Sequence, residues 1–526
     1  MVPNSLAGFD ERNKMPHSPR TMRILTGFSI LLAATVLTLR AADTATPRTI
    51  SLQECVEMAL KKNLELRIER VNPQFALYNL GAARAGYEPV LSLAGEHSHN
   101  ESGSRLISGG FSVPGAETDS DSFSGSLSGL TPWGMTYDLR GNANDQYGNS
   151  FGFDTNLNQV VAFPFNSSQS SVAIDVAQPL LKNFWIDGTR LSIAVAKNRV
   201  KHSELGLKAR IIDIVTRVEL AYYDLEFAHE SVKVQQTALE LAQRLLAENK
   251  KRVEVGALAP LDEKQSEAEV AARQADLIAA QRNLELLENN LKQLLHDDFA
   301  SWSAQGIEPT DALNKDRQLF NLQDSWARGL SSRPEYLQAT LDVEQQGFQL
   351  KYDKNQLYPQ LDIVGTYGYN GSGREFSDSL HQVSERDLPF YAYGGRLTVP
   401  LGNGAARNRY RSSKAGRDQT VLVLKKLEQD IMIAIDNAIK LAQSNFERIE
   451  ATRKARDYAE AALAAEQKKL ENGKSTSFIV LSLQRDLTAA RSDEIAAVVQ
   501  YNRSLALVAQ AEGSTLERRK IDLTVK

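Results

Sequence analysis

The residues with the clearest potential for chemistry are two histidines beside an acidic residue, His97 and His99 with Glu96. Alternate residues of a strand share a face, so the two imidazoles could bind one metal ion. An isolated pair near the end of a strand is more typical of a solvated loop, and we predict no metal site. The single cysteine, Cys55, excludes an intramolecular disulfide and a cysteine-based zinc site. We expect it to be a half-buried helical thiol.

Common catalytic motifs are missing from the sequence. It holds no G-x-S-x-G turn, no Walker-type phosphate loop and no HExxH pair. The 526 residues are 42% hydrophobic and 24% charged, which is typical of a folded protein. With 61 Lys and Arg against 65 Asp and Glu, the net charge of −4 argues against a nucleic-acid-binding protein. We therefore predict no enzyme activity, no cofactor and no nucleic-acid partner.

The elements that could position functional residues begin after an N-terminal targeting segment. Basic residues precede the apolar run Ile24–Leu39, and the small residues Ala41 and Ala42 follow it. This pattern predicts a cleaved secretory signal peptide over residues 1–42. A membrane anchor is the alternative, but the apolar run is shorter than the about 20 residues that a spanning helix needs.

The remaining chain reads as an internal duplication. Residues 50–93 align without gaps on residues 320–363. The positions that are identical in the second copy are Leu52, Gln53, Leu60, Glu65, Leu80, Pro89 and Leu91. Later landmarks keep their order, since Pro179 corresponds to Pro400 and Gly256 to Gly473. Repeats of this kind indicate one supersecondary unit used twice, with a long insertion in the first copy.

Each copy contains a long helical hairpin. Prolines are absent between Pro179 and Pro260 and after Pro400. Apolar residues step by three and four, as in a coiled-coil seam. They are Ile211, Val215, Val218, Tyr222 and Leu225 in copy one, and Leu427, Ile431, Ala434, Ala438 and Leu441 in copy two. The spacing predicts helical hairpins over residues 187–295 and 403–512.

Between the helices the apolar period changes to two. Val172, Ile174 and Val176 alternate with polar or small residues that include Asp175. Residues 361–399 alternate in the same way, with tyrosines on one face and Arg396 on the other. An apolar face opposite a polar face is the signature of a transmembrane β-barrel, with lipid outside and a polar lumen inside. A half-buried strand in a soluble sheet is the alternative for each single segment.

One chain holds too few of these strands to close a barrel, since small outer-membrane barrels have about eight. Several chains must therefore contribute strands jointly. The insertion over residues 94–170 is rich in Ser, Gly and Asn, which favours a large loop. It could also hold a hairpin over residues 122–142, with Thr131-Pro132-Trp133-Gly134 at its turn. The sequence leaves open whether this hairpin joins the barrel.

The order of these segments resembles the TolC-like family of outer-membrane efflux and secretion channels. The motifs that carry the resemblance are LQECVEMALKKN, QPLLKNF, VELAYYDLEFA, VGALAPLDEKQSEAEVA, VPLGNGAARNR and ENGKSTSFIVLSLQRDL. The resemblance implies a homotrimer with about four strands per chain in a 12-stranded barrel in the outer membrane of a Gram-negative cell. It also implies a helical periplasmic tunnel, a periplasmic adaptor protein and an inner-membrane pump as partners, and contact with outer-membrane lipid.

The resemblance assigns roles to residues near two glycines. Gly256 and Gly473 match the turns at the tips of the hairpins, although each could equally be an ordinary helix C-cap. Ala257 and Lys474 follow them as expected adaptor contacts. Asp262 and Glu263 would face the entrance or an adaptor, or would simply suit the helix dipole.

The family's constriction ring is altered in this sequence. Family members often carry acidic residues six and nine positions after the second tip glycine, where this chain has Ile479 and Ser482. We therefore expect an apolar constriction at Phe478 or Ile479 in place of an acidic gate. Asp175 and Arg396 are expected to face the barrel lumen.

The predicted organisation is a signal peptide (1–42), repeat 1 (43–295), a connecting segment (296–319), repeat 2 (320–515) and a C-terminal tail (516–526). In each repeat a helix, barrel strands and a long helical hairpin follow one another. The predicted function is an exit duct for small molecules or proteins in a tripartite efflux or type I secretion system. The alternative is a secreted coiled-coil surface protein without transport activity.

Overall fold

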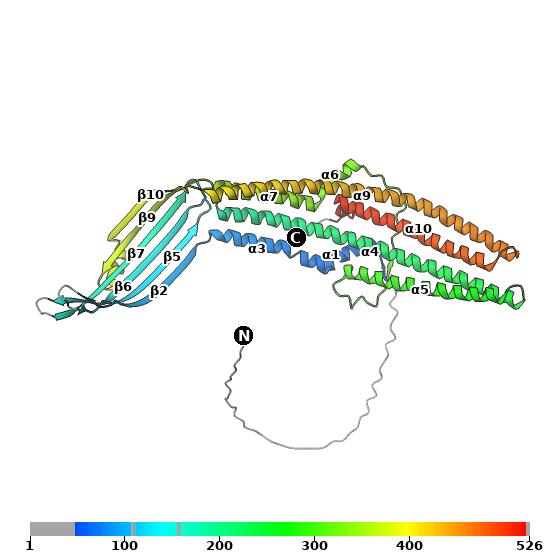
Figure 1. Ribbon diagram of the computed structural model, residues 1–526, viewed down its shortest axis with the longest axis horizontal. Helices are drawn as coiled ribbons and strands as arrows, with labels where there is room; N and C mark the ends of the chain where they lie inside the picture. Colours follow the sequence, from blue (N-terminus) through cyan, green and yellow to red (C-terminus); the bar gives the residue numbers. More distant parts are fainter. Residues whose placement is uncertain (1–47, 107–109, 111, 155–158, 522–526) are drawn as a thin grey trace, which may run out of the picture. The chain divides into compact units, whose positions relative to one another are not determined.

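Four long helices are the largest elements of the computed structural model, which describes residues 48–106, 110, 112–154 and 159–521. They are α4 (Gly188–Glu254), α5 (Pro260–Leu295), α9 (Gly404–Glu471) and α10 (Ser477–Glu512). Helices α4 and α5 form one antiparallel hairpin, and α9 and α10 form another (Figure 1). The hairpins predicted over residues 187–295 and 403–512 have nearly these bounds. The predicted signal peptide lies outside the described residues.

Shorter helices precede each hairpin and repeat the duplication. The first copy has α1 (Leu52–Lys62), α2 (Leu64–Glu69), α3 (Asn72–Arg84) and the 3₁₀ turn η1 (Ala85–Tyr87). The second has α6 (Leu322–Ser332) and α7 (Pro334–Asn355). Helices α1 and α6 both start at a polar cap, because Ser51 accepts a hydrogen bond from the Glu54 N–H and Asn321 from the Gln323 N–H. A last short helix, α11 (Thr515–Arg518), opens the predicted tail.

The helical core follows the predicted seam closely in copy one only. Ile211, Val215 and Tyr222 are buried in a cluster with Ile50 and with residues of α1 and α5. In copy two the buried residues of α9 at the level of the predicted seam are Ile431, Ile435, Ile439 and Ala442. Of the seam predicted there, Leu427, Ile431 and Ala438 do pack in this cluster. Ala434 and Leu441 were predicted wrongly, because α9 carries apolar residues on two faces and these two are exposed within this chain.

Six of the described strands form one antiparallel sheet. Its members are β2 (Val90–Glu101), β5 (Glu117–Leu130), β6 (Thr136–Asp154), β7 (Gln159–Pro179), β9 (Gln360–Gly373) and β10 (Leu388–Thr398). The order across the sheet is β10-β9-β7-β6-β5-β2 (Figure 1). The sheet of one chain thus has six strands, where about four were predicted.

The two additional strands come from the insertion that the sequence favoured as a loop. Strands β5 and β6 meet at a tight turn, where the Thr131 N–H donates to the Met135 carbonyl at 2.8 Å and Gly134 has a φ of +91°. The hairpin suspected over residues 122–142 therefore joins the sheet. Two short pairs complete the strands: β1 (Arg48–Ile50) with β8 (Ile307–Pro309), in the predicted connecting segment, and β3 (Arg105–Leu106) with β4 (Ser112–Val113).

A short helix that the sequence analysis did not expect, α8 (Phe376–Glu385), separates β9 from β10. It packs on β7 and β9 and ends at Arg386, which adopts the left-handed conformation with a φ of +61°. The stretch over 361–399 is thus two strands joined by a helix. No helix within the described ranges is both long enough and apolar enough to span a membrane.

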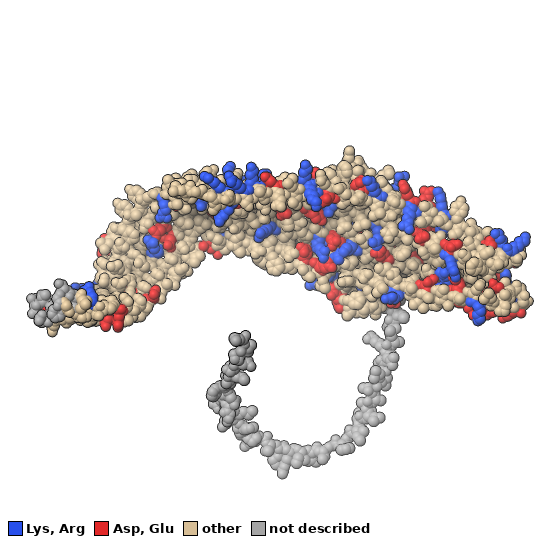
Figure 2. All heavy atoms as spheres, viewed as in Figure 1, with Lys and Arg blue, Asp and Glu red and all other residues tan. Residues whose placement is uncertain are grey.

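Charge is distributed unevenly between the helices and the sheet. On the face seen in Figure 2, Lys, Arg, Asp and Glu are dense and intermixed over the long helices and sparse over the middle of the sheet. Polar and charged surfaces suit helices in water, whereas a sheet with few exposed charges suits a less polar environment.

The reactivity of Cys55 tests whether α1 is packed into the helical core. The cysteine is helical, as predicted, but its side chain is fully buried in α1 and not half-buried, and this burial raises the pKa of the thiol to about 12. The thiolate is the reactive form, so a thiol with so high a pKa should stay unlabelled by maleimide at pH 7 to 8 in the folded protein. Labelling should become complete in denaturant. Rapid labelling of the folded protein at pH 7 would show that α1 is not packed as described.

Candidate functional site

The first hairpin turn is built around Gly256. At the end of α4 the Gly256 N–H donates to the Val253 carbonyl at 2.9 Å, and the Ala257 N–H donates to the Arg252 carbonyl at 2.7 Å. This pair of bonds is a Schellman motif, whose turning residue must adopt a left-handed conformation. Gly256 has a φ of +74°, which glycine reaches without steric cost.

The second hairpin ends in the same motif. The Gly473 N–H donates to the Leu470 carbonyl at 3.1 Å, and the Lys474 N–H donates to the Lys469 carbonyl at 2.8 Å. Gly473 has a φ of +66°. The two turns also lie together, because Arg252 donates to the Leu470 carbonyl at 3.2 Å. The duplicated glycines thus end two hairpins in one place with Ala257 and Lys474 exposed.

Asp262 and Glu263 lie in the first turn of α5, as predicted, and each has a local structural partner. The Asp262 carboxylate accepts a hydrogen bond from the Ala259 N–H at 3.2 Å and so caps the helix. A Glu263 carboxylate oxygen lies 3.8 Å from Lys250 Nζ. Both side chains remain half-exposed and available to a partner.

Phe478, Ile479 and Ser482 share one exposed face at the start of α10. Their spacing of three and four residues places them side by side on the helix. Phe478 is 66% exposed and Ile479 is 43% exposed, although both are large and apolar. An exposed apolar pair next to a turn fits a surface that another chain covers.

A buried ion pair near the tips was missed in the sequence. Glu269 on α5 is almost fully buried and bonds to two arginines. Arg485 Nε of α10 lies 3.1 Å from one carboxylate oxygen, and Arg273 Nε lies 2.8 Å from the other. The signal was present in the duplication, because Glu269 and Arg485 follow the two tip glycines at nearly the same distance.

The Glu269 cluster should make the tips sensitive to acid. Burial opposes ionisation of Glu269, but the hydrogen bonds from Arg485 and Arg273 prevail and hold the pKa of Glu269 below its ordinary value. The contribution to stability is therefore present above the ordinary pKa and is lost as the pH falls through the lowered one. Glu269→Gln should weaken the contact between α5 and α10 by about 1–3 kcal/mol at pH 7. Hydrogen exchange of the tip segments between pH 3 and 7 measures this.

The matched control is Glu267→Gln on the same helix. Glu267 pairs with Lys250 and Lys264 at the surface, where ion pairs contribute at most about 1 kcal/mol. Equal effects of the two substitutions, or an acid dependence that persists in Glu269→Gln, would refute a special role for Glu269.

The polar face of the sheet contains Asp175, one of the two predicted lumen residues. Its Oδ2 lies 3.1 Å from Arg140 Nε, and its Oδ1 accepts a hydrogen bond from Thr366 Oγ1 at 2.5 Å. Arg396, the other predicted lumen residue, is exposed on the edge strand and stands opposite Asp362 in the register. Both predicted residues line one hollow of about 620 Å³, together with Asp138 and Glu88. The hollow combines charges of both signs on one face.

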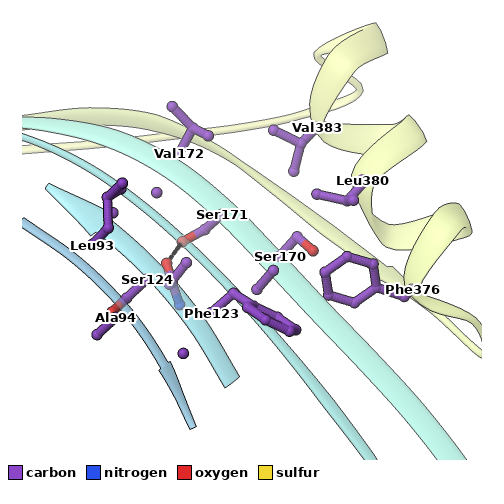
Figure 3. A pocket seen from close by; sticks show the side chains of 15 residues that line it. Leu93, Ala94, Phe123, Ser124, Ser170, Ser171, Val172, Phe376, Leu380 and Val383 are labelled. Carbon is purple, nitrogen blue, oxygen red and sulfur yellow. Dashed lines mark hydrogen bonds between the residues drawn. The ribbon is translucent and has the colours of Figure 1, made fainter. Parts of the chain in front are cut away.

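The opposite face of the sheet is apolar near the helices and covered by α8 further along. Phe376, Leu380 and Val383 point from α8 toward the strands (Figure 3). With Phe123 and Val172 they line a hollow of about 600 Å³. Ser379 of α8 lies 2.9 Å and 2.7 Å from the hydroxyls of Ser168 and Ser170 on β7, which holds the helix in place.

The histidines considered as metal ligands bond to carboxylates of the neighbouring strand. His97 Nδ1 lies 2.7 Å from Asp121, and His99 Nδ1 lies 2.7 Å from Asp119. These contacts place them beyond Phe123, where the otherwise apolar face becomes charged. Within the described part of the chain no group of three or more His, Cys, Asp or Glu is arranged to hold a metal.

Comparison with known proteins identifies the class to which this arrangement belongs. Residues 146–296 and 328–514 match the outer membrane efflux protein family, and these two segments cover most of the chain. The chain therefore belongs to the outer membrane efflux protein family. Its members are transport ducts rather than enzymes, located in the outer membrane with the helices on the periplasmic side.

Individual relatives extend over most of the sequence. The chain is 22% identical over 385 residues to the outer membrane protein TolC of Vibrio cholerae, covering 70% of this chain and 82% of that protein. The crystal structure of VceC from Vibrio cholerae superposes with a TM-score of 0.63 at 16% identity, over 88% of this chain and 96% of VceC. The CmeC channel of Campylobacter jejuni gives a TM-score of 0.62 at 14% identity, over 90% of each chain. These structures share the fold.

Proposed function

We propose that this efflux channel is a homotrimeric exit duct that exports small molecules or proteins as part of a tripartite efflux or type I secretion system. The observation that carries the proposal is the junction of two different structures in one chain. A sheet that is polar on one face and apolar on the other continues directly into paired helical hairpins that end in matching turns. Such a chain supplies a membrane-spanning wall and a water-filled passage leading to it.

The proposal that copies assemble side by side rests on apolar residues at both flanks. Helices α3, α4, α7 and α9 lie next to one another in that order, so α3 and α9 are the outer pair. The exposed residues of the first flank include Ile68, Phe75, Leu77 and Tyr78, and those of α9 include Leu422, Val423, Ile433 and Leu441. Two different apolar flanks on one chain form a head-to-tail interface, which can close into a ring.

The tips are the proposed site of contact with an adaptor and of the constriction. The contact surface comprises Gly256, Ala257, Asp262, Glu263, Gly473 and Lys474. Val255 and Leu261 add exposed apolar area beside it, with 79% and 66% of each residue exposed. Phe478, Ile479 and Ser482 form the proposed narrowing, which is apolar and therefore admits cations and anions with little distinction.

The alternative of a secreted coiled-coil surface protein explains the helices and the signal sequence alone. It gives no reason for six adjacent strands that sort apolar from polar residues between two faces. Family membership also counts against it.

Photo-crosslinking from the tips tests the proposed role. A photoreactive residue at Ala257 or Lys474 should capture a periplasmic adaptor and its pump in living cells, identified by mass spectrometry. The control position is Arg411, which is exposed near the opposite end of α9 and should capture neither protein. Recovery of cell-surface proteins alone from the tip positions would contradict the proposal. The pump that is captured would also indicate the class of substrate.

A further inference from the structure

The six strands of the sheet share one continuous pattern of faces. A row of residues that are directly opposite one another crosses the whole sheet: Leu91, Leu127, Leu139, Ile174, Tyr367 and Tyr391. Every member is apolar or aromatic. A neighbouring row on the other face contains Ser128, Asp138, Asp175 and Thr366. The insertion hairpin β5–β6 therefore carries the same division into an apolar and a polar face as the strands around it.

This pattern matters because a hairpin outside the membrane has no need of it. Leu127 and Leu139 belong to β5 and β6, and they continue the apolar row between β2 and β7 without a break. Arg140 of β6 also reaches Asp175 of β7 on the polar face. The hairpin thus occupies the position of wall strands at the level of the apolar row.

The width of the sheet supports the same conclusion. Strand β2 follows α3, β7 precedes α4, β9 follows α7 and β10 precedes α9, so the sheet is joined to four adjacent helices. Four helices packed about 10 Å apart span roughly 40 Å. A strand tilted by about 40° occupies about 6 Å of circumference, so six strands span roughly 38 Å and four strands only roughly 25 Å. Six strands match the helices that they continue.

The two edge strands of the sheet indicate what it pairs with, namely another copy of this chain. Among the strands that the structure describes, β2 and β10 each pair on one side only. Their free N–H and C=O groups cannot remain unpaired in lipid. All neighbouring strands are antiparallel, and six is an even number, so β2 and β10 run in opposite directions. Strand β10 of one copy can therefore pair with β2 of the next in the same antiparallel pattern.

We propose that all six strands enter the barrel wall and that each copy closes on the next through β10 and β2. With the trimer of the proposed function, on which this inference rests, three six-stranded sheets give an 18-stranded barrel. Barrel diameter grows roughly in proportion to strand number, so this barrel is about half as wide again as one of 12 strands. Barrels of 16–18 strands enclose an open aqueous channel.

Cysteine cross-linking in isolated outer membranes tests the strand order. In a Cys55→Ala background, Leu91→Cys with Leu127→Cys should form an intramolecular disulfide, and so should Leu139→Cys with Ile174→Cys. The pair Leu91→Cys with Ile174→Cys should not link, because two strands separate these residues. A disulfide in that last pair would overturn the proposal, since it would place β2 directly beside β7. Leu93→Cys with Gly125→Cys repeats the first test one row away if the first pair lowers the yield.

A second set of pairs tests closure between copies. Leu91→Cys or Leu93→Cys combined with Tyr393→Cys or Leu397→Cys should link separate chains into a ladder that ends at the trimer. An assembled oligomer in which none of these pairs links would overturn closure through β10 and β2. Export is measured on the same strains, which separates the two proposals. If the disulfides form as expected but export is absent, this inference is supported and the proposed function is contradicted. If export is normal but β2 is linked to β7, the proposed function is supported and this inference is contradicted.

Discussion

Replacing Ile174 by arginine should remove most of the folded protein from the outer membrane. Ile174 lies in the middle of the apolar row of the sheet and is 43% exposed within one chain. A charge on the lipid-facing side of a barrel costs about 2–4 kcal/mol near the middle of the bilayer. The effect should appear as a lower urea midpoint of the purified protein in lipid vesicles and as a lower yield in outer membranes.

The matched control is Ser171→Arg on the same strand. Ser171 belongs to the polar face, where it stands opposite Asn142 and Asn370. An arginine there enters a surface that already holds Arg140 and Arg396, so the loss of stability should be less than about 1 kcal/mol. Equal loss from both substitutions, or greater loss from Ser171→Arg, would show that the two faces of the sheet have been assigned the wrong way round.

Replacing both tip glycines by alanine should loosen the hairpin turns. Gly256 and Gly473 have φ values of +74° and +66°. A Cβ in this conformation costs roughly 1–2 kcal/mol at each position. In Gly256→Ala/Gly473→Ala the turn segments should exchange amide hydrogens about tenfold faster or more, because 1.4 kcal/mol corresponds to a factor of ten. Export should fall in parallel if the turns form the adaptor surface.

The control is Gly347→Ala, for which the expected change in stability has the opposite sign. Gly347 lies within α7, and a Cβ built there meets no described atom within 4 Å. Alanine in a helix is more stable than glycine by up to about 1 kcal/mol, so this variant should be neutral or slightly stabilised. Faster exchange at the tips in Gly347→Ala, or unchanged exchange in the double variant, would contradict the explanation from backbone conformation.

The helical part of the fold was largely predictable because its signals are local. The three-four spacing around Val215, and the glycines followed by Ala257 and Lys474, mark helix faces and helix ends without reference to distant residues. The second seam was less predictable. Helix α9 carries two apolar faces, and only tertiary packing decides that Ile435 is buried while Leu441 is exposed.

The sheet was predicted less completely because one of its strands has few apolar residues to mark the alternation of faces. In β5 the residues from Ser122 to Ser128 alternate serine with Phe, Gly and Leu, so few apolar side chains mark the period of two. The same Ser- and Gly-rich composition is typical of loops. Pairing with Leu91 on one side and Leu139 on the other makes the strand evident, and that pairing is visible only in three dimensions.

The candidate site was also only partly predictable from the sequence. Asp175 and Arg396 could be assigned to the polar face by alternation alone, but the partners of Asp175, Arg140 and Thr366, come from two other strands. The ion pair of Glu269 joins helices from the two repeats, more than 200 residues apart. Contacts of this kind leave no periodic signal in a single sequence.

The open edges of the sheet also have a genetic consequence. In a closed ring, a copy that folds but cannot pair through β2 or β10 leaves an unsatisfied edge on a sound neighbour. When a defective gene is expressed beside a working one, the share of complete rings therefore falls faster than the share of sound chains. Edge alleles should act as dominant negatives, whereas alleles that destroy the chain before it meets a partner should be recessive.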